Sequence, residues 1–114
     1  MTNRVGFVLV KPQLPENVGF CARAIKNFGF KKLDLVNPKE KWPNRKALAT
    51  SVGANDILKK TKVYSNIKSA THSYDILYAS SARKRDINKK HLSFKQFIES
   101  IKKNKNKKIG VIFG

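Results

Sequence analysis

The sequence predicts a single α/β domain over residues 1–114, with a mostly parallel sheet and helices on both of its faces. Short apolar runs alternate with helix-like segments along the whole chain. The first run, VGFVLV at 5–10, is apolar almost throughout, as expected of a strand that is covered on both sides. A length of 114 residues suits one hydrophobic core, and no repeat or linker divides the chain.

The remaining elements follow from apolar periodicity and from residues that end helices and strands. After the strand at 5–10 we expect a helix at 16–29, a strand at 31–36, a helix at 43–54, a strand at 61–65, a short helix at 66–73, a strand at 74–80, a helix at 93–105 and a strand at 108–114. Gly29 and Gly53 are placed to end helices, and Asn66 and Ser93 are placed to cap helix starts.

The strong positive charge indicates a polyanionic partner. The chain has 25 Lys and Arg against 7 Asp and Glu, a net charge of +18, and such side chains release counterions from phosphates. Most of these residues are lysines, however, and an AT-rich coding sequence also produces that skew on solvated surfaces. The basic connector KKNKNKK at 102–108 favours a solvated loop over a specific site.

Other classes of protein are disfavoured by what the sequence lacks. One cysteine, Cys21, excludes an internal disulfide framework, and the two histidines offer no metal-ligand spacing, so no metal is expected. No apolar run approaches the roughly 20 residues of a membrane span. The start of the chain resembles a core strand rather than a signal peptide, and we expect a cytoplasmic protein without a membrane partner.

The helix at 16–29 carries the first candidate site. Helical periodicity places one stripe against the sheet, and its members are Val18, Cys21, Ala22, Ile25 and Phe28. Arg23 lies opposite this stripe, with Gly19 one turn before it, where a missing side chain leaves the backbone open to an anion. Together with Asn17, beside the end of the first strand, these residues face a phosphate or sugar. The alternative is an Asn cap, a tolerated Gly and a solvated Arg.

The second candidate site is SSARKR at 80–85, directly after a predicted strand. The small residues Ser80, Ser81 and Ala82 allow a ligand to approach the backbone, and Arg83 and Arg85 add positive charge. A basic turn is the alternative. Neither a dinucleotide-binding nor a nucleotide-triphosphate glycine motif follows the first strand, which disfavours both of those functions.

These segments resemble the SpoU/TrmH-type RNA 2′-O-ribose methyltransferases of the knotted SPOUT class. VLVKPQLPENVGFCARAIKNFGFKKLDLVNP resembles the first motif of that family. The matching residues are Pro15, Asn17, Gly19, Arg23, Asn27, Gly29, Leu33, Leu35, Val36 and Pro38. SVGANDIL and ASSARKR are similar to the TrmJ branch, which modifies tRNA, and VIFG is similar to the start of the second motif.

The resemblance implies methyl transfer from S-adenosylmethionine to a ribose 2′-hydroxyl of RNA, most of all tRNA. It implies a catalytic Arg23 with Asn17 beside it. It implies cofactor contacts from Ser80, Ser81, Ala82 and Gly114, and RNA contacts from Gly19, Arg23, Arg83 and Arg85. An Arg with a pKa above about 12 is a poor base, so for Arg23 we expect phosphate binding and stabilisation of developing oxyanion charge.

Two further expectations come from the segments that follow this region in the family. An N-E-x-x-G-L segment and a third motif form a trefoil knot there, so the resemblance predicts that residues 1–114 are a domain that stops before the cofactor-binding knot. Family members of full length are homodimers. The alternatives left open are a non-catalytic RNA-binding fragment or pseudoenzyme, and an unrelated small α/β domain whose charge is compositional.

Overall fold

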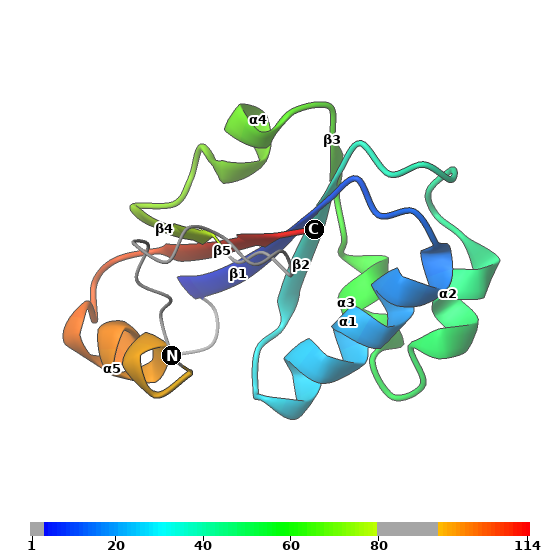
Figure 1. Ribbon diagram of the computed structural model, residues 1–114. Helices are drawn as coiled ribbons and strands as arrows, with labels where there is room; N and C mark the ends of the chain where they lie inside the picture. Colours follow the sequence, from blue (N-terminus) through cyan, green and yellow to red (C-terminus); the bar gives the residue numbers. More distant parts are fainter. Residues whose placement is uncertain (1–3, 80–93) are drawn as a thin grey trace, which may run out of the picture.

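The computed structural model describes residues 4–79 and 94–114, in which five parallel strands alternate with helices (Figure 1). The elements are β1 (Val5–Val10), α1 (Pro15–Asn27), β2 (Lys32–Val36), α2 (Arg45–Thr50), α3 (Asn55–Lys59), β3 (Val63–Tyr64), α4 (Ile67–Thr71), β4 (Ile76–Ala79), α5 (Phe94–Lys103) and β5 (Ile109–Phe113). The predicted α/β class with a parallel sheet is confirmed.

The strand order is β3-β2-β1-β5-β4, and every neighbouring pair is parallel. All strands therefore end at one edge of the sheet, which we call the carboxyl edge, and begin at the opposite amino edge. From β1, the next two strands β2 and β3 are added on one side of the sheet. β4 then forms the outermost strand on the opposite side, and β5 lies between β4 and β1. The direction of building thus changes between β1 and β5, which is where open α/β sheets bind their ligands.

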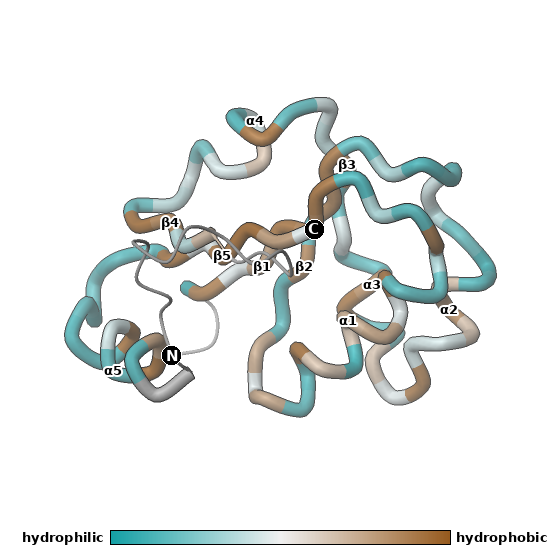
Figure 2. The backbone as a smooth tube through the Cα atoms, in the orientation of Figure 1, coloured by the Kyte–Doolittle hydropathy of each residue, from teal (hydrophilic) through white to brown (hydrophobic). Residues whose placement is uncertain are grey.

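Helices cover both faces of the sheet, but unevenly. In Figure 1, α1, α2, α3 and α5 lie on one face and α4 alone lies on the other. The larger core cluster lies on the first face and includes Leu33, Leu35, Ile101 and Ile109. The smaller cluster, under α4, centres on Val8, Val36 and Ala70. Figure 2 shows the same arrangement, with the apolar chain concentrated in the strands.

The helix boundaries follow the predicted capping residues in two places. Gly29 has a φ of 86° immediately after the C-cap of α1, as expected of a glycine that ends a helix. The Asn66 side chain caps α4 by accepting a 2.8 Å hydrogen bond from the Ser69 N–H. The proposed cap at Ser93 lies outside the described residues.

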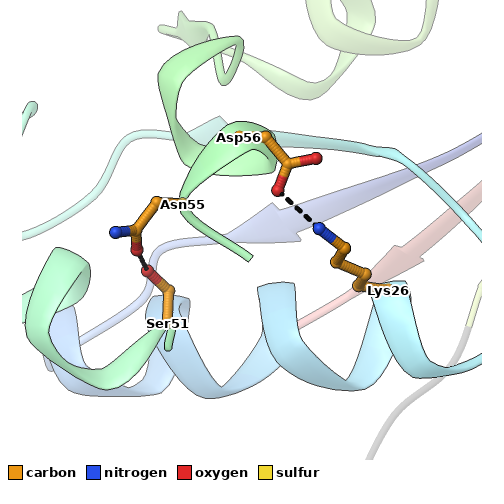
Figure 3. A network of polar contacts seen from close by, with 4 residues as sticks. All are labelled: Lys26, Ser51, Asn55 and Asp56. Atoms are coloured by element: carbon orange, nitrogen blue, oxygen red, sulfur yellow. Dashed lines mark hydrogen bonds and ion pairs between the residues drawn. The ribbon is translucent and has the colours of Figure 1, made fainter. Parts of the chain in front are cut away.

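The helix predicted at 43–54 is present but shorter, since α2 spans Arg45–Thr50, and the short helix α3 that follows this segment was not predicted. α2 ends at Thr50, Gly53 turns the chain with a φ of 80°, and α3 then runs from Asn55. The side chains of Ser51 and Asn55 lie 2.5 Å apart and join the two helices across the turn (Figure 3). Gly53 therefore lies in the turn after α2, close to where it was predicted to end the helix.

An exposed ion pair fixes α3 against α1. The Lys26 ammonium lies 3.0 Å from an Asp56 carboxylate oxygen (Figure 3). This hydrogen bond lowers the pKa of Asp56 below its usual value. Exposed pairs of this kind contribute little to stability, so the contact orients α3 rather than holding the fold together.

Arg4 ties the start of β1 to the end of α5. Its guanidinium donates to the carbonyl oxygens of Ile101 at 2.7 Å, Asn104 at 2.7 Å and Lys107 at 3.2 Å. These acceptors lie at the carboxyl end of a helix, where the unpaired carbonyls carry partial negative charge. One side chain therefore fixes the segment that leads from α5 into β5.

Tyr74 fills a gap left by two glycines in adjacent strands. Gly6 and Gly110 are register partners in β1 and β5. A Cβ at Gly6 would overlap the Tyr74 hydroxyl, and one at Gly110 would lie 2.8 Å from the Tyr74 ring. The ring therefore lies close against the bare backbone of the two central strands. Its hydroxyl is buried, and the residues that the structure describes give it no hydrogen-bond partner.

We predict that Gly6→Ala lowers the free energy of unfolding by about 1–3 kcal/mol, because the added methyl overpacks against Tyr74. In a Tyr74→Phe background the loss should be smaller, since the overlapping hydroxyl is gone. Urea denaturation of both single variants and the double variant measures the coupling. An equal loss in the two backgrounds would show that Tyr74 is not what excludes a side chain at position 6.

Burial, with smaller contributions from the charges of Asp34 and Tyr64, raises the pKa of Tyr74 to about 12. A raised folded-state pKa stabilises the neutral form, so its contribution is present below the unfolded pKa of about 10 and is lost as the pH rises towards 12. We predict one late-titrating tyrosine in an absorbance titration, absent from Tyr74→Phe. Retention of the late phase in that variant would contradict the assignment.

Candidate functional site at the carboxyl edge

The loops that follow β1 and β2 form the centre of the carboxyl edge. Lys11 and Asn37, the first residue after each strand, have φ values of 49° and 51°, a conformation that residues other than glycine seldom adopt. The Lys11 N–H donates to the Val36 carbonyl at 2.7 Å, and the Lys39 N–H donates to the Pro12 carbonyl at 3.1 Å. Main-chain hydrogen bonds therefore hold the two loops together.

A small hollow lies where these loops meet the start of α1. Its lining includes Pro12, Pro15, Pro38 and Trp42. The three prolines have restricted backbones, so this part of the edge is formed by stiff chain segments.

Gly114 lies at this edge, next to the end of β1. A Cβ at position 114 would overlap the carbonyl oxygen of Val10, so the close approach of β5 to β1 leaves no room for a side chain there. The residue is otherwise exposed. The residue predicted to contact the cofactor thus directly follows β5 and lies beside the end of β1, where the strand order changes.

Asn17 also lies near the carboxyl edge, in the first turn of α1. The N-cap is Leu14, which has no side-chain capping bond, and Pro15 begins the helix. The Asn17 N–H donates to the Leu14 carbonyl at 3.1 Å. Its exposed side chain is therefore not used as the helix cap, and the first-turn position predicted for it is confirmed.

The expectation that Gly19 leaves the helix open to an anion is wrong. Gly19 is buried, and a Cβ there would overlap the Thr50 hydroxyl and the Ala47 carbonyl. The same hydroxyl donates to the Glu16 carbonyl at 2.9 Å, which fixes α2 against the first turns of α1. Gly19 therefore allows two helices to pack closely, and α2 covers the backbone that we expected an RNA phosphate to reach.

Arg23 is exposed, as its predicted position opposite the packing stripe requires. No carboxylate among the residues that the structure describes forms an ion pair with it. α1 leads away from the carboxyl edge, so Arg23 lies about 9 Å further along the helix axis than Asn17, and about 120° around it. Within one copy of the chain, the two predicted catalytic residues can therefore contact neighbouring groups of one ligand but not the same atom.

The stripe predicted to pack on the sheet is rotated in the structure. The buried residues of α1 are Pro15, Val18, Gly19, Ala22 and Ile25. Cys21 is only half-buried, and burial raises the pKa of its thiol. Phe28, which we expected against the sheet, is 62% exposed. The packing of α2 beside α1 accounts for this rotation.

The second predicted constellation lies outside the described residues. Ser80, Ser81, Ala82, Arg83 and Arg85 all fall there. The structure places the last residue before them, Ala79, at the end of β4. Because β4 is parallel to β5, the chain enters this segment at the same edge of the sheet as Gly114.

Two kinds of site are absent from the described residues, 4–79 and 94–114. No group of three His, Cys, Asp or Glu is arranged to hold a metal ion. None of the helices in these ranges is long and apolar enough to cross a membrane.

These features define an open parallel α/β domain whose ligand edge lies beside its change in strand order. The chain belongs to the SpoU rRNA Methylase family, whose sequence profile matches residues 4–114. The alternative of an unrelated α/β domain is therefore wrong. The resemblance to this family, first seen in the first helix and its flanking strands, is therefore confirmed, and the match extends over almost the whole chain.

Curated relatives carry related names. The chain is 39% identical over 87 residues to the tRNA (cytidine/uridine/adenosine-2′-O-)-methyltransferase TrmJ of Pseudomonas aeruginosa, which covers 76% of this chain and 34% of that protein. It is 34% identical over 113 residues to the tRNA (cytidine-2′-O-)-methyltransferase TrmJ of Methanocaldococcus jannaschii, covering 96% and 48%. The chain thus spans a third to a half of the length of these relatives.

Solved structures agree. The crystal structure of TrmJ from Z. mobilis superposes with a TM-score of 0.85 at 34% identity, covering 94% of this chain and 48% of that one. A probable methylase family protein from Haemophilus influenzae gives a TM-score of 0.85 at 28% identity, covering 97% and 45%. The five-stranded sheet described above is therefore the fold of this family.

The packing of Gly19 against α2 gives a prediction that separates a structural from a ligand-facing glycine. Alanine normally stabilises a helix by about 1 kcal/mol relative to glycine. We expect Gly19→Ala instead to lower the free energy of unfolding by about 1–3 kcal/mol, through overlap with Thr50 and Ala47.

Ala24→Gly, at an exposed position of the same helix, is the control and should show only the loss of about 1 kcal/mol from propensity. Thermal and urea unfolding measure both variants. A stabilised Gly19→Ala protein would restore the open-backbone interpretation of this position.

Proposed function

We propose that the chain acts in RNA ribose 2′-O-methylation, with S-adenosylmethionine as methyl donor, tRNA as substrate and the cytoplasm as its location. The observation that carries this proposal is the family match over residues 4–114. The carboxyl edge supports it, since Asn17 and Gly114 both lie there. The names of the relatives support the tRNA substrate.

In this reaction a bond forms between the ribose O2′ and the methyl carbon, the bond from sulfur to that carbon breaks and leaves a neutral thioether, and the O2′ proton passes to solvent water. The donor supplies the electrophilic methyl group. Arg23 is proposed to bind a phosphate next to the target ribose and to stabilise negative charge on O2′, because a guanidinium stays protonated near neutral pH. The Asn17 amide is proposed to hydrogen-bond the ribose.

The donor is proposed to bind at the carboxyl edge between β4 and β5. Gly114 offers exposed backbone there, and adenosyl groups take backbone N–H and C=O partners. Ser80, Ser81 and Ala82 follow β4 at the same edge and are small enough to let a ligand approach their backbone. Arg83 and Arg85 are proposed to bind RNA beside them. Gly19 has no part in this proposal, since α2 covers it.

A homodimer is proposed as the functional state, and α1 supports it. Phe20 is 51% exposed on α1, and Leu14, which directly precedes the helix, is 54% exposed. Large exposed apolar side chains mark interaction surfaces. A chain with a net charge of +18 repels its own copies, so self-association requires a surface of this kind, without lysines.

The prediction for this interface is that Phe20→Lys shifts the chain from dimer to monomer in sedimentation velocity at micromolar concentrations, because it adds charge to an apolar contact. Val52→Lys is the matched control, since Val52 is 72% exposed on another surface. Phe20→Lys sedimenting like the unaltered chain would place the dimer contact elsewhere.

The prediction for Arg23 is that Arg23→Ala in the native gene product lowers methyl transfer to unmodified tRNA by at least about 100-fold, as expected for loss of one charge-stabilising group. Donor binding measured by calorimetry should stay unchanged. Arg45→Ala removes another exposed arginine and should leave turnover unaffected. Unchanged turnover in Arg23→Ala would defeat the assignment.

A non-catalytic RNA-binding protein is the second candidate, and the net charge of +18 favours it. Calorimetry of the 114-residue chain with S-adenosylmethionine separates the two functions. Micromolar binding supports the enzyme, and RNA binding without donor binding supports the second candidate.

A further inference from the structure

The amino edge of the sheet collects lysines from three separate parts of the sequence. In a parallel sheet, every segment that enters a strand lies at the same edge. The residues concerned, which we call the basic rim, are all exposed: Lys31, Lys32, Lys60, Lys62, Lys105, Lys107 and Lys108. They enter β2, β3 and β5.

The strand order and register place these lysines along a diagonal line across the sheet. Lys32 is the register partner of Gly6 in β1, and Lys108 directly precedes Ile109, the partner of Val5. Lys62 directly precedes Val63, the partner of Leu35. Lys62 lies level with Asp34, two residues further along the strands than Lys32, and Lys108 lies two residues before the level of Lys32. With strands about 4.8 Å apart and about 3.3 Å per residue, the rim therefore runs diagonally over about 20 Å. In Figure 1 the starts of β1 and β2 lie between α5 and the end of α1, whereas the chain enters β3 above α3.

The connector at 102–108 is held in place rather than left loose. Arg4 binds the carbonyls of Asn104 and Lys107. On the other side, the Asp75 carboxylate accepts the Lys108 N–H at 2.8 Å, and the Asp75 N–H donates to the Lys108 carbonyl at 2.8 Å. The main chain is thus fixed from both neighbouring strands while the lysine side chains face solvent.

Nearby carboxylates leave most of this charge uncompensated. Asp34 is buried, accepts the Lys62 N–H at 3.0 Å and lies 3.9 Å from the Lys32 ammonium. Within the described part of the chain, Lys32 alone among the rim lysines has such an ion pair. Lysines gathered without counter-charges repel one another, and a bound polyanion removes that cost.

We propose that the basic rim binds the phosphate backbone of an RNA molecule, at the edge of the sheet opposite the site of methyl transfer. This inference rests on the proposed function for its choice of RNA as the polyanion. The rim consists of lysines, which bind phosphates as point charges without reading bases. β1 has six residues, so the two edges lie about 20 Å apart, and a folded RNA reaches both.

Fluorescence anisotropy with labelled unmodified tRNA tests the rim. The triple variant Lys105→Gln, Lys107→Gln, Lys108→Gln removes three rim charges. Its control, Lys41→Gln, Lys46→Gln, Lys68→Gln, removes the same charge from exposed positions away from the amino edge. Circular dichroism shows that both variants are folded.

We expect the rim variant to lose about 10-fold or more in affinity near physiological salt, and its slope of log K against log salt to fall by about 2–3. The control should change by less than about 3-fold. Equal losses in the two variants, or no loss in the rim variant, would overturn the proposal. So would tighter binding of the chain to vesicles of anionic lipid than to tRNA.

The proposal for the rim and the proposed function are tested by different measurements, so one can be disproved while the other stands. If the rim variant keeps its affinity for tRNA while methyl transfer still depends on Arg23, the rim is wrong and the proposed function stands. If the native gene product neither binds the donor nor supports methyl transfer, but the rim variant still loses tRNA affinity selectively, the proposed function is wrong and the rim stands.

Discussion

The parallel pairing of β1 with both β2 and β5 is the constraint on which the rest of this structure depends. It makes all strands end at one edge and begin at the other. Segments that follow strands therefore meet at the carboxyl edge, where Gly114 and the first turn of α1 lie. Segments that precede strands meet at the amino edge, where the lysines gather. The two candidate binding surfaces are consequences of one hydrogen-bonding pattern.

Three glycines show how much of a motif can serve packing. Gly6 and Gly110 leave space on the central strands that the Tyr74 ring occupies. Gly19 allows α2 to approach α1 until the Thr50 hydroxyl reaches the Glu16 carbonyl. A glycine in a functional motif is easily assigned to ligand contact. Here the close packing of α2 is sufficient to explain why position 19 is a glycine. α2 also positions Asn17, because it fixes the first turns of α1.

The sequence was sufficient for the strands, for α1 and for the parallel sheet, because apolar runs and helix-ending residues are local signals. It failed where a distant segment decides the outcome. Gly19 was placed on the wrong side of its helix because periodicity does not reveal that α2 packs there. The helix α3 was missed for another reason, since its five residues are too few to show helical periodicity. The role of Arg4 depends on carbonyls about a hundred residues away and leaves no trace in the local pattern.

Arginine and lysine side chains have different roles in this chain, because their charged groups differ in geometry. Arg4 makes three directed hydrogen bonds to carbonyl oxygens, which suits the planar fork of a guanidinium and not a single ammonium. The rim lysines face solvent and act only through their charge. Lysines far outnumber arginines in this chain, so the arginines stand out where several directed bonds are needed. Arg23 is one of only five arginines in the chain, which favours a directed contact over a solvated charge at the exposed face of α1.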